Sequence, residues 1–255
     1  MPKCRTMQDA IPAATVVILR EVEGAPPQLL MVERAKAMAF AGGALVFPGG
    51  RIDPGDHALA ATLPDAPADA AARIAAIRET IEEAGLPIGL SPMPDAAGLA
   101  ALRAGLHAGG AFGALLADAG ATLDLAALTP FARWRPAHAH ARIFDTHFYL
   151  ARLPAGAPEA EVDATENVRL FWASAQDVLD DADAGRARII FPTRRNLERL
   201  ARHASFAAAI ADAARYPIRT VTPWIEQRDD GRYVCIDDDL GYPVTAERFE
   251  QAMRV

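Results

Sequence analysis

The chain has few cysteines, no long apolar run and no excess of positive charge. Its two cysteines, Cys4 and Cys235, lie at opposite ends of 255 residues and form no C-x-x-C or Cys/His pattern, which argues against a disulfide framework or a cysteine-based metal site. No stretch approaches the roughly 18 to 20 apolar residues of a transmembrane helix, and the first twenty residues lack the pattern of a secretory signal. We therefore expect a cytoplasmic protein with no membrane partner.

The charge balance is acidic, with a formal net charge of −7. Because nucleic-acid binding by counterion release needs a basic surface, we expect no nucleic-acid partner. A composition with 51% hydrophobic and 23% charged residues is typical of globular proteins. The length and the pattern predict one α/β domain over 1–255, with insertions at about 57–68 and 91–127 and a C-terminal extension from about 216.

Apolar, β-branched runs at 14–20 and 28–34 predict a pair of strands. The run at 44–47 predicts a strand that feeds a glycine-rich loop. From about 69 to 83 the apolar residues recur every three or four positions and predict a helix that ends at Gly85; the stripe consists of Ile74, Ile77 and Ile81. Further on we expect strands at 143–153 and 166–173, a helix at 174–185, one long helix at 191–214, a hairpin across 228–231 and a last helix at 245–253.

The helix at 69–83 ends in "RETIEEAGL", residues 78–86. Glu79, Glu82 and Glu83 stand at i, i+3 and i+4, so their carboxylates gather on one helix face, where like charges repel. A solvated helix end, with Arg78 paired to Glu82, is one interpretation. A site for a hard divalent cation is the other, and the preceding "FPGG" favours it, because glycines let the backbone approach a phosphate closely.

With these residues in place, the sequence resembles the Nudix hydrolase family, whose box reads G-x5-E-x7-R-E-U-x-E-E-x-G-U, where U is aliphatic. Most of the second half matches, although Thr80 stands where the box has its first aliphatic residue; the matching positions are Gly50, Arg78, Glu79, Glu82, Glu83, Gly85 and Leu86. The resemblance implies an α/β/α sandwich with a mixed sheet, here with helical insertions. It also implies metal-dependent hydrolysis of a nucleoside diphosphate linked to another moiety.

The resemblance further implies the site residues. Glu79, Glu82 and Glu83 are the expected ligands of Mg²⁺ or Mn²⁺, with the Gly50 carbonyl as a further ligand, and Arg78 orients the glutamates. Arg34, Gly49 and Gly50 are the expected contacts of the nucleotide substrate. Since many members dimerise, a homodimer is also an expectation from resemblance.

The box is interrupted at its first glutamate. Five residues separate Gly50 from Asp56, but 21 residues then separate Asp56 from Arg78, and the position eight before Arg78 is Ala70. Asp56 and Asp69 are both candidates for the missing acid. An insertion at this point is typical of the branch that includes the mammalian peroxisomal coenzyme A diphosphatase, and "VFPGGRID", "RIAAIRETIEEAG" and "RIFDTHFYL" match that branch.

The coenzyme A signature upstream of "FPGG" is kept in part. Arg34 is present, whereas the second arginine of the signature falls on Ala39, and Lys36 is a nearby source of positive charge. Coenzyme A or acyl-coenzyme A is therefore the first substrate class. A different dinucleotide or a nucleotide sugar, and a non-catalytic nucleotide-binding protein, stay open as alternatives.

Other residues are weaker candidates. Glu166 lies where some Nudix proteins contribute an additional acid. His138, His140 and His147 could act as bases or ligands, although surface positions are more usual. The aromatic side chains on two expected strands could stack on a base, but alternation predicts that most lie in the core; they are Phe144, Phe148, Tyr149 and Trp172.

Overall fold

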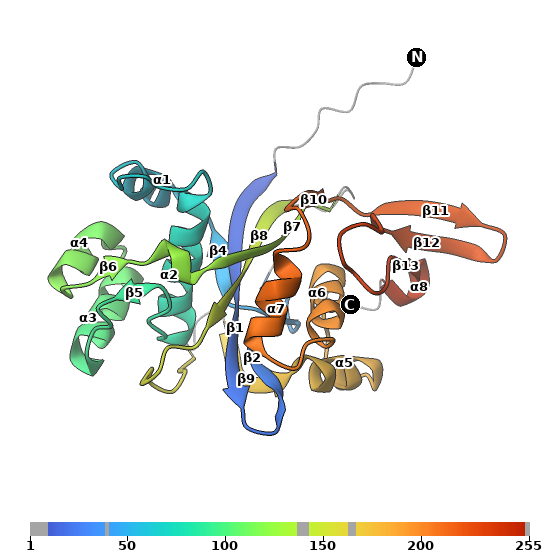
Figure 1. The fold of residues 1–255 in the computed structure, drawn as a ribbon, viewed down its shortest axis with the longest axis horizontal. Coiled ribbons are helices and arrows are strands. Elements are labelled where there is room, and N and C mark those ends of the chain that lie inside the picture. Colours follow the sequence, from blue (N-terminus) through green and yellow to red (C-terminus); the bar gives the residue numbers. More distant parts are fainter. Residues whose placement is uncertain (1–9, 39–40, 137–142, 163–166, 253–255) are drawn as a thin grey trace, which may run out of the picture.

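A mixed sheet lies between two layers of helices (Figure 1). The computed structural model describes residues 10–38, 41–136, 143–162 and 167–252. Within this part, eight strands form the main sheet in the order β10-β7-β8-β1-β2-β3, with β4 paired to β1 and β9 paired to β2. This architecture confirms the expected α/β/α sandwich with helical insertions.

The centre of the sheet is built from β1 (Ile11–Val22) and β2 (Ala25–Arg34), which form an antiparallel hairpin. On its other side β1 runs parallel to β8 (Phe144–Arg152), and β8 pairs antiparallel with β7 (Thr129–Trp134). The central residues of β1 are buried on both faces, as expected for a strand covered by helices on two sides.

The glycine-rich stretch adopts strand structure. It contains β3 (Leu45–Val46) and β4 (Gly49–Arg51), and β4 pairs antiparallel with the beginning of β1. The prediction of a strand that feeds a loop was therefore only partly right. The pairing of β4 fixes the two glycines against the central strand.

One face of the sheet is covered by α2 (Ala70–Ala84), which begins after Asp69 and ends at Gly85 in the left-handed conformation, as the sequence predicts. The isoleucine stripe of α2 is completely buried against the sheet. Helices α3 (Ala96–His107) and α4 (Phe112–Asp118) pack their leucines against the same cluster. The short elements around them are α1 (Pro54–Ala60), β5 (Leu90–Ser91), β6 (Thr122–Leu123) and a 3₁₀ turn at Leu125–Ala127.

The other face is covered by α5 (Ala175–Asp183), α6 (Phe191–Leu200) and α7 (Phe206–Ala213), with β9 (Asn167–Ser174) leading into α5. The prediction of one long helix over 191–214 was wrong. Ser205 interrupts it, because its side chain accepts a hydrogen bond from the Ala208 amide and begins α7 as an N-cap.

The C-terminal part forms a second, small sheet beside α5 and α6 (Figure 1). After β10 (Thr220–Val221), the expected hairpin is present as β11 (Trp224–Arg228) and β12 (Gly231–Cys235). The expected last helix is shorter than predicted, because Ala246–Arg248 pair with β12 as β13 and only Phe249–Ala252 form α8. In the described residues, no helix has the length and apolar character needed to cross a membrane.

Candidate active site

The last turns of α2 lie against β4 at the edge of the sheet, and two glycines make the close approach geometrically feasible. A Cβ atom on Gly50 would lie 2.3 Å from the Glu79 carboxylate. At Gly49, φ is +152° and a Cβ atom would lie 2.4 Å from the Ala14 carbonyl oxygen. A side chain at Gly50 would therefore push the acidic helix away from β4, and one at Gly49 would push β4 away from β1.

Glu83 is buried, with an exposed fraction of 6%, and both of its carboxylate oxygens are bound. The Gly49 amide donates to Oε2 over 2.9 Å, and the Asn167 side chain donates to Oε1 over 3.0 Å. Burial raises the pKa of Glu83 to about 8, and the charge of Glu79 adds to this effect, while the two hydrogen bonds and Arg34 oppose it. Glu83 is thus held in place by two hydrogen bonds, while burial disfavours its ionised form.

Arg78 is anchored by Asp56. Its Nε and Nη2 atoms donate to the two oxygens of Asp56, each over 3.0 Å, and Asp56 is 2% exposed. Burial alone would lower the pKa of Arg78, but the hydrogen bond to Asp56 and the surrounding carboxylates raise it overall. Of the two candidates for the missing acid, Asp56 is the one that contacts the arginine of the acidic helix.

Asp69, the other candidate for that place, does not reach the site. Its oxygens accept hydrogen bonds from Arg73 and from the Tyr149 hydroxyl at the opposite end of α2. The choice between the two aspartates could not be made from spacing alone, because it depends on how the chain folds back after β4.

Arg78 also connects the two other glutamates. Its Nη1 atom donates to Glu79 over 2.9 Å and to Glu82 over 3.0 Å. Burial raises the pKa of Glu79 to about 7, although the charge of Arg78 opposes this. Glu79 and Glu82 therefore meet at Arg78, whereas Glu83 faces Gly49.

The three glutamates are neighbours but do not form a closed ligand cage. Among the described residues, no three acidic, histidine or cysteine side chains converge closely enough to define a metal centre. The donor set nevertheless fits a hard divalent cation, since it consists of carboxylate oxygens beside backbone. Burial is the main cause of the raised pKa values of Glu79 and Glu83, and a cation bound beside them would favour their ionised forms.

These residues line one half of a cleft of about 830 Å³, a volume in the range of small-molecule sites. We define the charged half by its ionisable and glycine residues: Arg34, Gly49, Gly50, Arg51, Asp53, Arg78, Glu79, Glu82, Glu83 and His107. All of the predicted site residues thus lie in this half. His107, at the end of α3, is the one cleft residue that the described part of the 91–127 block contributes.

The other half of the cleft extends over the second face of the sheet. We define the apolar half by its hydrophobic residues: Met38, Val46, Phe47, Trp134, Pro136, Phe144, Phe148, Ile190 and Pro192. Thr146 on β8 pairs with Ala13 on β1 and with Trp134 on β7, and Ala13 also pairs with Arg51 on β4. The apolar half therefore begins next to β4. Trp134 is fixed there, because its indole N–H donates to Asn196 and to Tyr242.

Several weaker candidates lie away from the cleft or outside the described residues. Lys36 is exposed and His147 stacks on Tyr149, and neither lines the cleft. Trp172 packs on the α2 side of the sheet under Arg20. Ala39, His138, His140 and Glu166 lie outside the described residues.

Sequence reasoning missed two groups of residues. Asn167, which binds Glu83, directly follows the candidate Glu166, and its signal was the polar start of an otherwise apolar strand. The residues before and at the start of α6, Ile190 and Pro192, gave no signal, because only the fold brings them to the cleft.

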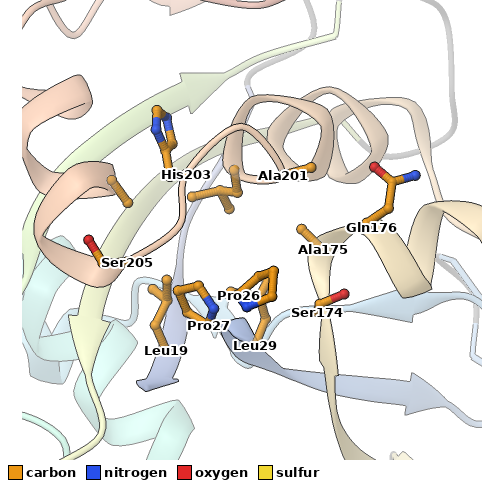
Figure 2. A pocket seen from close by; sticks show the side chains of 12 residues that line it. Leu19, Pro26, Pro27, Leu29, Ser174, Ala175, Gln176, Ala201, His203 and Ser205 are labelled. Atoms are coloured by element: carbon orange, nitrogen blue, oxygen red, sulfur yellow. The ribbon is translucent and has the colours of Figure 1, made fainter. Parts of the chain in front are cut away.

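A second pocket lies at the far end of the β1–β2 hairpin, between β9 and the α6–α7 turn (Figure 2). Its volume is about 30 Å³, and its lining includes Leu19, Pro27, Leu29 and His203 but no acidic side chain. A space of this size holds about one or two water molecules. We therefore place the functional site in the large cleft.

Comparisons with known proteins agree with this geometry. The family model "NUDT19 Nudix domain" matches residues 57–200, which include α2 and its three glutamates. The crystal structure of a Nudix hydrolase from Alicyclobacillus acidocaldarius is 28% identical and superposes with a TM-score of 0.69, over 81% of this chain and 97% of that one.

Two further structures are similar at lower scores. A C. elegans Ap4A hydrolase, solved as a binary complex, is 19% identical over 68% of this chain and 87% of that chain, with a TM-score of 0.39. The Nudix domain of Shewanella oneidensis NrtR, in a cocrystal structure with ADP ribose, is 14% identical over 73% and 88%, also with a TM-score of 0.39. Because the family model covers more than half of the chain, the conclusion rests on that match: this chain belongs to the Nudix hydrolases, a family of pyrophosphohydrolases, in the group of the NUDT19 Nudix domain.

Proposed function

We propose that this chain hydrolyses the diphosphate bond of a nucleoside diphosphate linked to another moiety, with coenzyme A or acyl-coenzyme A as the first substrate class. The observation that carries the proposal is the charged half of the cleft. There Glu79, Glu82 and Glu83 lie beside Gly49 and Gly50, which line the same cleft. Glutamates whose pKa values are raised by burial suit a site that takes up a cation together with its substrate.

In this proposal Glu79, Glu82 and Glu83 hold Mg²⁺ or Mn²⁺, with the Gly50 carbonyl as a further ligand. When bound, such a cation neutralises charge on the diphosphate and makes water more acidic. The chain itself supplies the orientation. Asp56 fixes Arg78, and Arg78 in turn holds Glu79 and Glu82.

Arg34 also lines the charged half, at the end of β2, where it pairs with Asn167 of β9. Its charge acts on Glu83. We propose that Arg34 contacts a phosphate, while Gly49 and Gly50 let phosphate oxygens approach the backbone.

Two observations support coenzyme A compounds within the larger class. The matching family model is that of NUDT19, the mammalian peroxisomal coenzyme A diphosphatase. The apolar half of the cleft, which is continuous with the charged half, offers hydrophobic side chains to a part of the substrate that lies beyond the diphosphate. An acyl chain fits this environment, because it has no hydrogen-bonding groups to leave unpaired.

The test is a substrate panel with Mg²⁺ and with Mn²⁺, comparing coenzyme A, acyl-coenzyme A, NADH, ADP-ribose and diadenosine compounds. We expect cleavage at the diphosphate, with the highest kcat/KM for a coenzyme A compound. Glu83→Gln should lose this activity while Asp69→Asn, an acid at the other end of α2, keeps it. No cleavage of any compound with either metal would overturn the proposal.

A further inference from the structure

The C-terminal end of α2 carries Glu82 and Glu83 in its last turn, so its backbone determines where these carboxylates lie. An α-helix leaves its last four carbonyl groups without a partner inside the helix. Here the Gly85 amide binds the Ile81 carbonyl, and the Glu161 amide binds the Ala84 carbonyl, each over 3.0 Å. Two carbonyls, those of Glu82 and Glu83, need a partner from elsewhere.

Arg103 of α3 supplies that partner. Its Nε atom donates to the Glu82 carbonyl over 3.0 Å, and its Nη2 atom donates to the Glu83 carbonyl over 3.4 Å and to the Glu161 carbonyl over 2.8 Å. The side chain is largely buried, with an exposed fraction of 16%. One guanidinium group therefore closes the end of the helix and links it to the segment after β8.

Gly85 makes room for this contact. It has the left-handed conformation, with φ at +65°, and a Cβ atom there would lie 3.2 Å from Nη1 of Arg103. The end of a helix also carries a negative partial charge, which disfavours carboxylates in the last turns and favours a cation. The carboxylates of Glu82 and Glu83 increase the negative charge at the C-terminal end of α2. Arg103 places its positive charge at this end and offsets it.

We propose that Arg103 is a positioning residue for the glutamates: it holds the last turn of α2 so that Glu82 and Glu83 present their carboxylates to the cleft. This role rests on the proposed function, since it acts on the residues proposed to bind the metal. In this role the helical block at 91–127 contributes to the site indirectly, because Arg103 binds the backbone of the acidic helix and not the substrate.

The chain contains a matched control in Arg73. Its Nη1 atom donates to the carbonyls of Leu125 and Leu128, over 2.8 and 2.7 Å, and its side chain is 13% exposed. Arg73 thus joins α2 to the end of the same block and to the residue after it by two hydrogen bonds to backbone carbonyls, and Arg103 likewise makes two such bonds to carbonyls of α2. It does so near the beginning of α2, far along the helix from the glutamates.

The experiment measures Mn²⁺ binding to the full-length protein by calorimetric titration, with thermal unfolding of each variant in parallel. We expect Arg103→Ala to raise the Kd for Mn²⁺ by about 10- to 100-fold, the effect typical of losing a group that orients a metal ligand. Arg73→Ala should lower the Tm to a similar extent but leave the Kd unchanged. Arg103→Lys keeps the charge but loses the forked hydrogen-bond donors of the guanidinium group. Its Kd for Mn²⁺ should lie between that of the wild type and that of Arg103→Ala.

Hydrogen exchange of the backbone amides gives a second readout that does not depend on metal. In Arg103→Ala the amides at 82–86 should exchange faster than in Arg73→Ala. If Arg103→Ala does not fold, Arg103→Lys becomes the test of the positioning role. A Kd for Mn²⁺ equal to that of the wild type in Arg103→Lys would then overturn this role. Equal Kd values for Arg103→Ala and Arg73→Ala overturn it too, whereas a wild-type protein that binds no Mn²⁺ overturns the proposed function itself.

Discussion

The charged half and the apolar half of the cleft are built in different ways. In the charged half, each of the three glutamates has specific partner atoms: Glu79 and Glu82 accept hydrogen bonds from Arg78, and Glu83 accepts from Gly49 and Asn167. The apolar half consists of side chains that offer surface and shape. Replacing one group in the charged half should therefore disturb several others, while the apolar half should respond mainly to polarity and size.

Glu83→Gln should produce the largest effect, because it removes a negative charge from the group that is most deeply buried among the three glutamates. The amide keeps the shape and can still accept the hydrogen bond from Gly49. We expect kcat/KM to fall by more than the roughly 10- to 100-fold typical of losing a group that only orients a metal ligand, because Glu83 is itself a proposed ligand. Unchanged hydrolysis of a coenzyme A compound would show that Glu83 has no part in the chemistry.

Asp56→Asn should produce the second-largest loss of activity. The amide can accept from only one of the two donors of Arg78, so the guanidinium is less firmly held and Glu79 and Glu82 lose their common anchor. We expect kcat/KM to fall by about 10- to 100-fold. The matched control is Asp69→Asn, which breaks the pair with Arg73 at the far end of α2 and should lower the Tm without this loss of activity.

The pH dependence of stability offers a third comparison. The pKa values of Glu79, about 7, and Glu83, about 8, lie above the 4.5 of an exposed glutamate. The folded protein thus binds more protons than the unfolded chain across this range, so the free energy of unfolding falls as the pH rises from about 4.5 to about 8. Each group contributes at most about 1.4 kcal/mol per pH unit.

Thermal unfolding in a chelator should show this decline, and Mg²⁺ or Mn²⁺ should reduce it, because a cation favours the ionised carboxylates. The double variant Glu79→Gln, Glu83→Gln should lose the decline above about pH 6 and the response to metal, whereas burial also raises the pKa of Glu198 to about 6 and keeps part of the decline below that pH. A metal-free protein whose Tm is constant between about pH 5 and about pH 8 would contradict the raised pKa values.

The smallest effect is expected in the apolar half, from Ile190→Asp. Ile190 is the N-cap of α6 and makes no side-chain capping bond, so aspartate there should stabilise the helix while adding a charge to the apolar surface. We expect the ratio of kcat/KM for acyl-coenzyme A over coenzyme A to fall by about tenfold, or about 1.4 kcal/mol. Ala111→Asp adds the same charge at the exposed N-cap of α4 and should leave the ratio unchanged.

Much of the charged half could be predicted from the sequence, because its residues are close together in the chain. A helical period and a terminal glycine define α2, and the spacing of its glutamates follows from one turn of helix. Asn167 and Arg103 could not be predicted, since each reaches α2 from a segment distant in sequence. The roles of the site residues, the cytoplasmic location, the homodimer and the single-domain boundaries stay predictions.

Most of the apolar half could not be predicted for a related reason, although Phe144 and Phe148, two candidates for stacking on a base, do line it. Trp134, Phe148 and Ile190 come from two strands and the start of a helix, and each fits an ordinary core pattern. A hydrophobic side chain has the same signature in the sequence whether it packs in the core or lines a cleft. The break between α6 and α7 was missed because Ser205 is a single capping residue inside an alanine-rich helical stretch.

The contact between Asp56 and Arg78 also bears on how such proteins are found. It joins two residues that are 22 positions apart, so the intervening segment can change in length while the ion pair keeps the same place in space. A search that requires a fixed number of residues between the acid and the arginine would overlook this chain. One that asks for an aspartate or glutamate bound to the arginine of an R-E-x-x-E-E helix would recognise it.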